Sequence, residues 1–160
     1  MKVLDCGLIA FLLLVSSSSV FADGVITPDM VNGFFESQNK FIHEKNLQAS
    51  LDLLADDFSI TAPNGSIRDK AGFRLGLING FILSERLEQA SLVTSLAIST
   101  YGKTAEAVVE SNARTYIMKD AGLVVFHDVD RAVVDFRLVD GRLLETKCVA
   151  TKISSRAERD

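Results

Sequence analysis

The chain has 160 residues, 48% of them hydrophobic, and a formal net charge of −4 at pH 7. This length suits a single domain with one hydrophobic core. No cluster of lysines and arginines forms a basic stripe, and no basic amphipathic helix is present. The composition therefore argues against nucleic acid and against a membrane surface as partners.

Residues 1–22 have the pattern of a secretory signal peptide. Met1 and Lys2 give a positive start, an apolar run follows from Gly7 to Val15, and small Ala22 closes the segment. The apolar run is shorter than the roughly 20 residues that a membrane-spanning helix needs. We therefore predict cleavage after Ala22 and export to the periplasm or the medium, with no span in the mature protein. The alternative is an uncleaved anchor.

The rest of the chain divides into a predicted domain over residues 23–153 and a polar tail over residues 154–160, which we expect to be frayed. It contains one cysteine, Cys148. No internal disulfide can therefore support the mature chain, and its stability must come from its core. Cys148 lies in an apolar run, and we interpret it as a buried, unreactive thiol.

The N-terminal half predicts three helices. Thr27 and Pro28 are typical of an N-cap and a first turn, Asn46 of the cap of a short second helix, and Asp69 of the cap of a third that ends near Leu83. In the first helix, helical spacing predicts an apolar face made of Val31, Phe34, Phe35, Phe41 and Ile42. We expect this aromatic face to pack in the core, with the wall of a ligand pocket as the alternative.

Two further features stand in this half of the chain. Asp56 and Asp57 are predicted to end the second helix in an exposed position. Gly72, Gly76 and Gly80 recur every four residues in the third helix, where each costs up to about 1 kcal/mol relative to alanine. Their spacing suggests that another helix or the sheet approaches the helix backbone closely. The alternative is that a bound ligand approaches it.

From Leu87 onward the pattern is that of β-strands with one apolar and one polar face. The segment from Leu123 to Ile153 predicts two long strands joined by a tight turn at Asp140-Gly141, since that turn needs positive φ. The first arm runs about 17 residues, long against the usual ~5–6, so we expect curvature and a bulge. The order of elements predicts an α+β fold, a cone-shaped, curved antiparallel sheet wrapped around the N-terminal helices.

Two segments resemble the nuclear transport factor 2-like superfamily, in its SnoaL-like branch of small bacterial domains: LLADDFSITAPNGSIRDKAGFRLGLINGF and SLAISTYGKTAEAVVESN. The resemblance covers roughly residues 31–153. It implies a cone-shaped α+β barrel, a deep pocket between sheet and helices, and homodimers formed through the sheet. It implies no single reaction, because members include isomerases, dehydratases, cyclases and non-catalytic binding modules.

The ketosteroid-isomerase-type members offer a more specific comparison. Their pattern ADD-x-x-x-x-D-P places the general base before the proline, whereas this chain has Ala62 before Pro63. Their first-helix tyrosine aligns with Gln38. The resemblance therefore does not carry isomerase activity to this chain.

The densest polar group follows the first long strand. His127, Asp128 and Asp130 stand there, and alternation puts the two aspartates on the face of Ala132 and Phe136. A carboxylate in an apolar pocket has its pKa raised and can act as an acid or base near neutral pH. We therefore take Asp130 and Asp128 as candidate catalytic residues, with His127 beside them if a bulge turns it inward. The alternative is that this end of the strand lies beyond the helices, solvated or paired across a dimer.

The predicted pocket lining is Phe34, Phe35, Gln38, Phe58, Ala62, Phe73, Phe126 and Phe136. No zinc-ligand spacing, phosphate-binding glycine loop or nucleophile elbow is present in the sequence, so we expect neither a metal nor a cofactor.

Three functional hypotheses follow. The first is an exported binding domain that takes a small, largely apolar ligand and has no assigned reaction. The second is a cofactor-independent acid/base enzyme, an isomerase, dehydratase or cyclase that uses a pocket aspartate. The third is a dimeric interaction module, in which Arg114 and Tyr116 would lie at the interface.

Overall fold

The computed structural model describes residues 24–159. Three helices and six strands follow one another along this part of the chain. The helices are α1 (Pro28–His43), α2 (Leu47–Asp52) and α3 (Lys70–Leu83). The strands are β1 (Leu54–Thr61), β2 (Ile67–Asp69), β3 (Arg86–Ile98), β4 (Thr104–Lys119), β5 (Gly122–Val139) and β6 (Arg142–Arg159).

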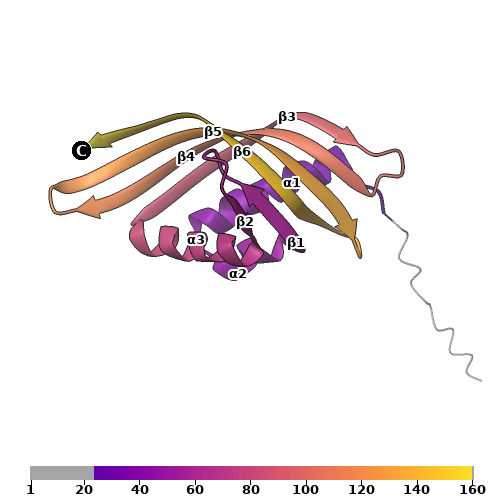
Figure 1. The fold of residues 1–160 in the computed structure, drawn as a ribbon, viewed down its shortest axis with the longest axis horizontal. Helices are drawn as coiled ribbons and strands as arrows, with labels where there is room; N and C mark the ends of the chain where they lie inside the picture. Colours follow the sequence, from indigo (N-terminus) through magenta and orange to yellow (C-terminus); the bar gives the residue numbers. More distant parts are fainter. Residues whose placement is uncertain (1–23, 160) are drawn as a thin grey trace, which may run out of the picture.

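The six strands form one curved sheet in the order β2-β1-β6-β5-β4-β3. Neighbouring strands are antiparallel except β1 and β6, which run parallel. Figure 1 shows the sheet as an arch with all three helices on its concave side. This arrangement confirms the predicted α+β architecture. The face toward the helices is called the inner face below, and the opposite one the outer face.

Helix α1 packs across the inner face through aromatic side chains. It begins at the predicted cap, where Thr27 Oγ1 accepts a hydrogen bond from the backbone N–H of Met30 over 3.3 Å. Phe34 and Phe35 are buried, and the Phe34 ring meets that of Phe136 edge to face at 5.0 Å. Burying a phenylalanine contributes roughly 1.5–3 kcal/mol. The core interpretation of the aromatic face is therefore correct for these two residues.

The long hairpin of β5 and β6 organises the sheet. Its turn has positive φ at Asp140 (49°) and Gly141 (75°), as the Asp-Gly pair predicts. The pairing of β5 with β6 shifts register twice, between Val129 and Asp130 and between Asp135 and Phe136. Each shift marks an irregularity of the bulge type, which bends a strand and increases its twist. The expected curvature therefore has its local cause in this hairpin.

The structure shows that two predictions about local structure are wrong. Asp56 and Asp57 do not end helix α2 but lie within strand β1. The polar segment 154–159 is not frayed, because β6 continues through it and pairs with the first half of β5 as far as Arg159. Backbone pairing along a long partner strand stabilises this segment although its side chains are polar.

No helix among residues 24–159 is long and apolar enough to cross a membrane. The predicted signal peptide, residues 1–22, lies outside the described part of the chain. Near the start of the described residues, the backbone N–H of Ile26 donates a hydrogen bond of 2.8 Å to the carbonyl oxygen of Gly102.

Candidate functional site

A cavity of about 340 Å³, called the cone cavity below, lies between the inner face of the sheet and the helices. Helix α1 contributes Phe35, Gln38 and Ile42, helix α3 contributes Phe73 and Leu77, and strands β1 and β3–β6 contribute the rest. The strand residues are Phe58, Ile60, Gln89, Val109, Ser111, Ala113, Asp130, Ala132, Val134, Glu145, Cys148 and Ala150. An apolar cavity with a few inward polar groups is the usual form of a small-molecule site.

Glu145 is the most unusual of these residues. It is only 4% exposed, and its described side-chain contact is with Gln38, whose Nε2 donates a long hydrogen bond of 3.5 Å to Oε2. Burial raises the pKa of Glu145 to about 8, because the charged carboxylate loses its hydration. At neutral pH the side chain is therefore mostly a neutral carboxylic acid inside the cavity.

A bulge in β6 turns Glu145 inward. Asp135 pairs with Lys147, but the next residue of β5, Phe136, pairs with Glu145, so Thr146 is an extra residue. Thr146 Oγ1 donates a hydrogen bond of 3.1 Å to the carbonyl oxygen of Asp135. In a regular strand with Cys148 facing inward, alternation would place Glu145 on the outer face.

A short polar network connects the cavity wall to helix α1. The hydroxyls of Ser111 and Ser91 lie 3.0 Å apart, and the Ser91 hydroxyl donates to Asn39 Oδ1 over 3.0 Å. Gln89 Nε2 donates to Ser91 Oγ over 3.4 Å. These contacts hold polar groups from β3, β4 and α1 beside the cavity.

The structure brings five of the predicted site residues to this cavity, which Phe35, Gln38, Phe58, Phe73 and Asp130 line. The other predicted pocket residues lie elsewhere. Phe34 and Phe136 pack against each other in the core. Ala62 lies in the β1–β2 turn, where its N–H donates to Ser66, and Phe126 lies under the ammonium group of Lys119.

His127 and Asp128 line a different hollow, of about 380 Å³, in the arm formed by β4, β5 and β6. Arg114, His127 and Arg156 lie directly opposite one another on these three strands, and His127 Nε2 lies 3.4 Å from Glu158. No bulge on β5 turns His127 toward Asp130, because the register shift nearby places its extra residue, Ile153, on β6. The structure thus separates His127 from the cone cavity.

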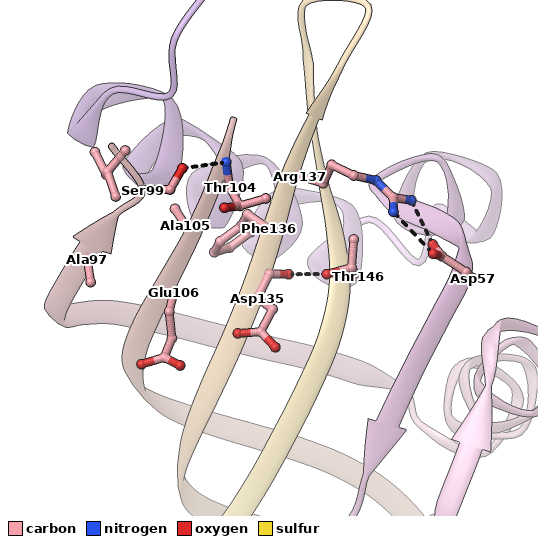
Figure 2. Close-up of a pocket in the computed structure, with 11 residues that line it drawn as sticks. Asp57, Ala97, Ser99, Thr104, Ala105, Glu106, Asp135, Phe136, Arg137 and Thr146 are labelled. Carbon is pink, nitrogen blue, oxygen red and sulfur yellow. Dashed lines mark hydrogen bonds and ion pairs between the residues drawn. The ribbon is translucent and has the colours of Figure 1, made fainter. Parts of the chain in front are cut away.

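A larger hollow of about 600 Å³ lies on the outer face, over β1 and β3–β6. Figure 2 shows Asp57 and Arg137 facing each other there, while Glu106 and Asp135 extend from neighbouring strands. Arg137 donates two hydrogen bonds to Asp57, over 2.8 and 3.2 Å, and this bonding lowers the pKa of Asp57. Because the pair is exposed, it contributes little to stability.

The chain resembles solved structures of low sequence identity. A hexachlorocyclohexane dehydrochlorinase of type 2 is 10% identical over 81% of this chain and 87% of that protein, with a TM-score of 0.65. A scytalone dehydratase-like protein from Novosphingobium aromaticivorans is 8% identical over 80% and 85%, with a TM-score of 0.67. A ketosteroid isomerase-like protein from Erwinia carotovora atroseptica is 13% identical over 79% and 95%, with a TM-score of 0.63.

The chain has the nuclear transport factor 2-like fold. The three solved structures share this fold, which is the one that the sequence resemblance implied. No family model and no curated protein sequence matches the chain. At these identities the likeness concerns the fold alone, so any function of this nuclear transport factor 2-like domain must be argued from its own residues.

The cone cavity is the better candidate site of this domain. The outer hollow is larger, but it is more open, its lining is as polar as it is apolar, and its Arg137 and Asp57 already bond each other. The cone cavity has an apolar lining and a buried carboxyl group with a perturbed pKa, a combination that is typical of functional sites. Within residues 24–159, no three histidine, cysteine, aspartate or glutamate side chains are placed to hold a metal ion.

Reasoning from sequence missed Glu145. Counting back by twos from apolar Cys148 assigns Glu145 to the solvent face, and nothing local in LLETKC marks the bulge. One signal was present: Leu143 and Glu145 are two residues apart, and Leu143 packs against the core. Alternation counted forward from Leu143 would have predicted an inward Glu145.

Proposed function

We propose that this nuclear transport factor 2-like domain binds a small, largely apolar molecule in its cone cavity. The observation that carries the proposal is an apolar cavity of about 340 Å³ with the buried carboxyl of Glu145 in its wall. At ~30 Å³ for each water, this volume holds roughly eleven waters, which suits a ligand of about a dozen non-hydrogen atoms. Gln38, Gln89 and Ser111 supply polar groups that would fix its orientation.

A matched pair of substitutions tests this proposal. Ala132 lines the cavity, and its neighbour Val133 points to the outer face. With cyclohexylmethanol as the probe in a calorimetric titration, we expect Ala132→Leu to weaken binding at least tenfold by filling the cavity, and Val133→Leu to leave it unchanged. Equal affinities in all three proteins would contradict the proposal, and so would failure of the wild type to bind both this alcohol and the amine of the same shape.

We further propose that the domain acts after export. The support is the signal-peptide pattern of residues 1–22. Mass determination of the protein purified from its own cells tests this: a mature chain that begins at Asp23 is expected. A chain that retains Met1 and stays in the cytoplasmic fraction would contradict export.

A second candidate function is proton transfer on a bound carbonyl compound. The observation that favours it is that Asp130 and Glu145 line one cavity, while burial raises the pKa of Glu145 to about 8. A carboxyl group that keeps its proton near neutral pH suits the role of acid, and a second carboxyl group in the same cavity can serve as the base. Asp130 would take a proton from carbon beside the carbonyl as Glu145 gives one to the carbonyl oxygen, and the enol would return by the reverse transfers. The names of the similar structures include a dehydratase-like and an isomerase-like protein.

Hydrogen–deuterium exchange on cyclohexanone tests this second candidate. The wild type in D₂O is expected to accelerate loss of the α-hydrogen signals, because each enolisation replaces hydrogen with deuterium. Asp130→Asn and Glu145→Gln should each reduce that acceleration about a hundredfold or more. If exchange matches the buffer rate, the domain does not perform this chemistry on the probe, and the binding proposal alone remains.

A further inference from the structure

We infer that the cone cavity takes a lipophilic amine in its protonated form, with the carboxylate of Glu145 as the counter-ion for the ammonium group. This inference rests on the proposed binding function and specifies the chemical class of the ligand. It follows from three properties of the cavity wall: its charge, its aromatic rings and its hydrogen-bond acceptors.

The charge of the wall excludes one ligand class and favours another. Among the described residues that line the cavity, Glu145 and Asp130 are acidic and none is lysine, arginine or histidine. Asp130 has an interaction partner of its own, so the argument uses Glu145, which is buried to more than nine-tenths. An anionic ligand would find no positively charged side chain in this wall. A cation supplies the opposite charge that a buried carboxylate requires.

The aromatic rings of the wall favour the same ligand class. Phe35 comes from α1, Phe58 from β1 and Phe73 from α3, so rings from three elements meet around one space. Phe58 and Phe73 contact edge to face at 5.5 Å. The face of an aromatic ring attracts a cation, and this attraction grows when water is excluded.

Acceptors for the remaining ammonium protons are also in place. An ammonium group has three donors and no acceptor. Besides the carboxylate of Glu145, the amide oxygens of Gln38 and Gln89 and the hydroxyl of Ser111 lie in the wall. The apolar remainder of the ligand would fill the space beside Val109, Val134 and Leu77.

Amine binding must be coupled to proton release by Glu145. Its pKa of about 8 means that the free domain holds this proton at pH 7, and an arriving ammonium group displaces it to solvent. The amine therefore binds about tenfold more weakly at pH 7 than at pH 9, because at pH 7 most Glu145 side chains must first lose their proton.

The other titratable groups of the wall are Asp130 on β5 and Cys148 on β6. Burial and the nearby Glu145 raise the pKa of Cys148 to about 12, outside this range. Helices α1 and α3 and strands β1, β3 and β4 present uncharged side chains to the cavity.

The test compares cyclohexylmethylamine with cyclohexylmethanol, which have the same shape and number of non-hydrogen atoms. Calorimetric titration at pH 7 in HEPES and in phosphate, whose ionisation enthalpies differ, measures the protons released. We expect the amine to bind at least tenfold more tightly than the alcohol and to release close to one proton per molecule bound. Its affinity should rise about tenfold from pH 7 to pH 9, while that of the alcohol should not rise.

Glu145→Gln should abolish both the proton release and the preference for the amine, whereas Glu106→Gln, at an exposed acid of the outer face, should change neither. Alcohol binding equal to or tighter than amine binding would overturn the inference and leave the binding function standing. Failure of both probes would overturn both. Proton release is measured on the wild type, so the inference stays falsifiable even if Glu145→Gln does not fold.

Discussion

At the scale of single residues, the buried acid Glu145 governs how stability depends on pH. The native carboxyl keeps a proton that the unfolded chain releases from about pH 4.5 upward, because burial raises the native pKa to about 8. The unfolded state therefore binds fewer protons between these values, and the free energy of unfolding falls as pH rises through this window. The contribution of this carboxyl group to stability is fully present below about pH 4.5 and is lost above about pH 8.

Glu145→Gln should remove most of this pH dependence, since the amide keeps the shape and never ionises. We expect the variant to be more stable than the wild type at pH 8.5 by a few kcal/mol, and similar to it at pH 5. Urea unfolding at the two pH values measures the difference. Glu106→Gln is the control and should follow the wild-type profile. A Glu145→Gln profile parallel to that of the wild type would refute the assignment.

Gly102 carries a second prediction at this scale. It has a φ of +66°, and a Cβ built on it would lie 2.6 Å from Val25 Cβ. Gly141 also has positive φ, +75°, but nothing lies within 4 Å of its Cβ position. We expect Gly141→Ala to cost about 1 kcal/mol for the left-handed backbone alone, and Gly102→Ala about 1–3 kcal/mol more for the clash. Equal losses in denaturant unfolding would show that Val25 moves aside freely.

At the scale of elements, the bulge at Thr146 decides which side chains enter the cavity. Removing Thr146 would leave Glu145 and Lys147 adjacent, on opposite faces as they are now. We expect this deletion to cost about 1 kcal/mol, the worth of the hydrogen bond from Thr146 to Asp135, and to preserve the fold. Deleting Val149, which has a regular partner, should cost several kcal/mol by turning Cys148 to the outer face. Similar losses for both deletions in urea unfolding would contradict this account.

Helix α3 is the least buried of the three helices. None of its residues is fully buried, whereas α1 buries Val31, Phe34 and Phe35. The sequence predicted that a helix or the sheet lies close to its glycine stripe. The sheet does approach Gly72 and Gly76, through the side chain of Arg68 on β2 and not through its backbone, whereas nothing lies within 4 Å of the Gly80 Cβ position. The glycines therefore lower the stability of α3, and few packing contacts at these positions compensate for that loss.

We expect the amides of α3 to exchange with solvent at least tenfold faster than those in the middle of α1. The reason is that local opening of α3 exposes little apolar surface. Hydrogen exchange read by mass spectrometry measures this. Because Phe73 and Leu77 line the cavity, a ligand bound there should slow exchange in α3 more than in the β4–β5 turn. Equal protection in α1 and α3 would contradict the prediction.

At the scale of the whole molecule, the outer face is the surface on which we expect a second copy to pair. Val108, Val133 and Val149 lie directly opposite one another on β4, β5 and β6, and Val133 is 38% exposed. The adjacent row carries charges of both signs, with Glu106 and Asp135 beside Lys147. An apolar row flanked by mixed charges suits a self-complementary interface.

Val133→Glu should convert the expected dimer into a monomer, because two new like charges, one from each copy, would be buried in the apolar row of the symmetric interface. Native mass spectrometry and sedimentation measure the assembly state. Met118→Glu, at a 58% exposed position near the β4–β5 turn, is the control and should leave the dimer intact. A wild-type protein that is monomeric at micromolar concentration would refute this prediction. Arg114 and Tyr116, earlier candidates for the interface, contact Glu88 within the same chain.

The sequence by itself determined the elements and the fold class. Caps at Thr27, Asn46 and Asp69 and the turn at Asp140-Gly141 are local signals, because each depends on neighbouring backbone groups, and all four lie where predicted. Alternation also assigned Asp130 to the inner face correctly, since β5 stays regular on its own side. Caps and turns can be read from neighbouring residue types, and the face of a regular strand can be read from its period of two.

Tertiary structure decided the contents of the site. A bulge is an event between two strands, so neither strand alone shows that Thr146 is extra and Glu145 faces inward. Burial is likewise a property of the assembled layers: α1 brings Gln38 to Glu145, a partner 107 positions away in sequence. The pKa of Glu145 is perturbed only when helix and sheet exclude water together, which is why the sequence predicted the cavity and Asp130 in its wall but not Glu145.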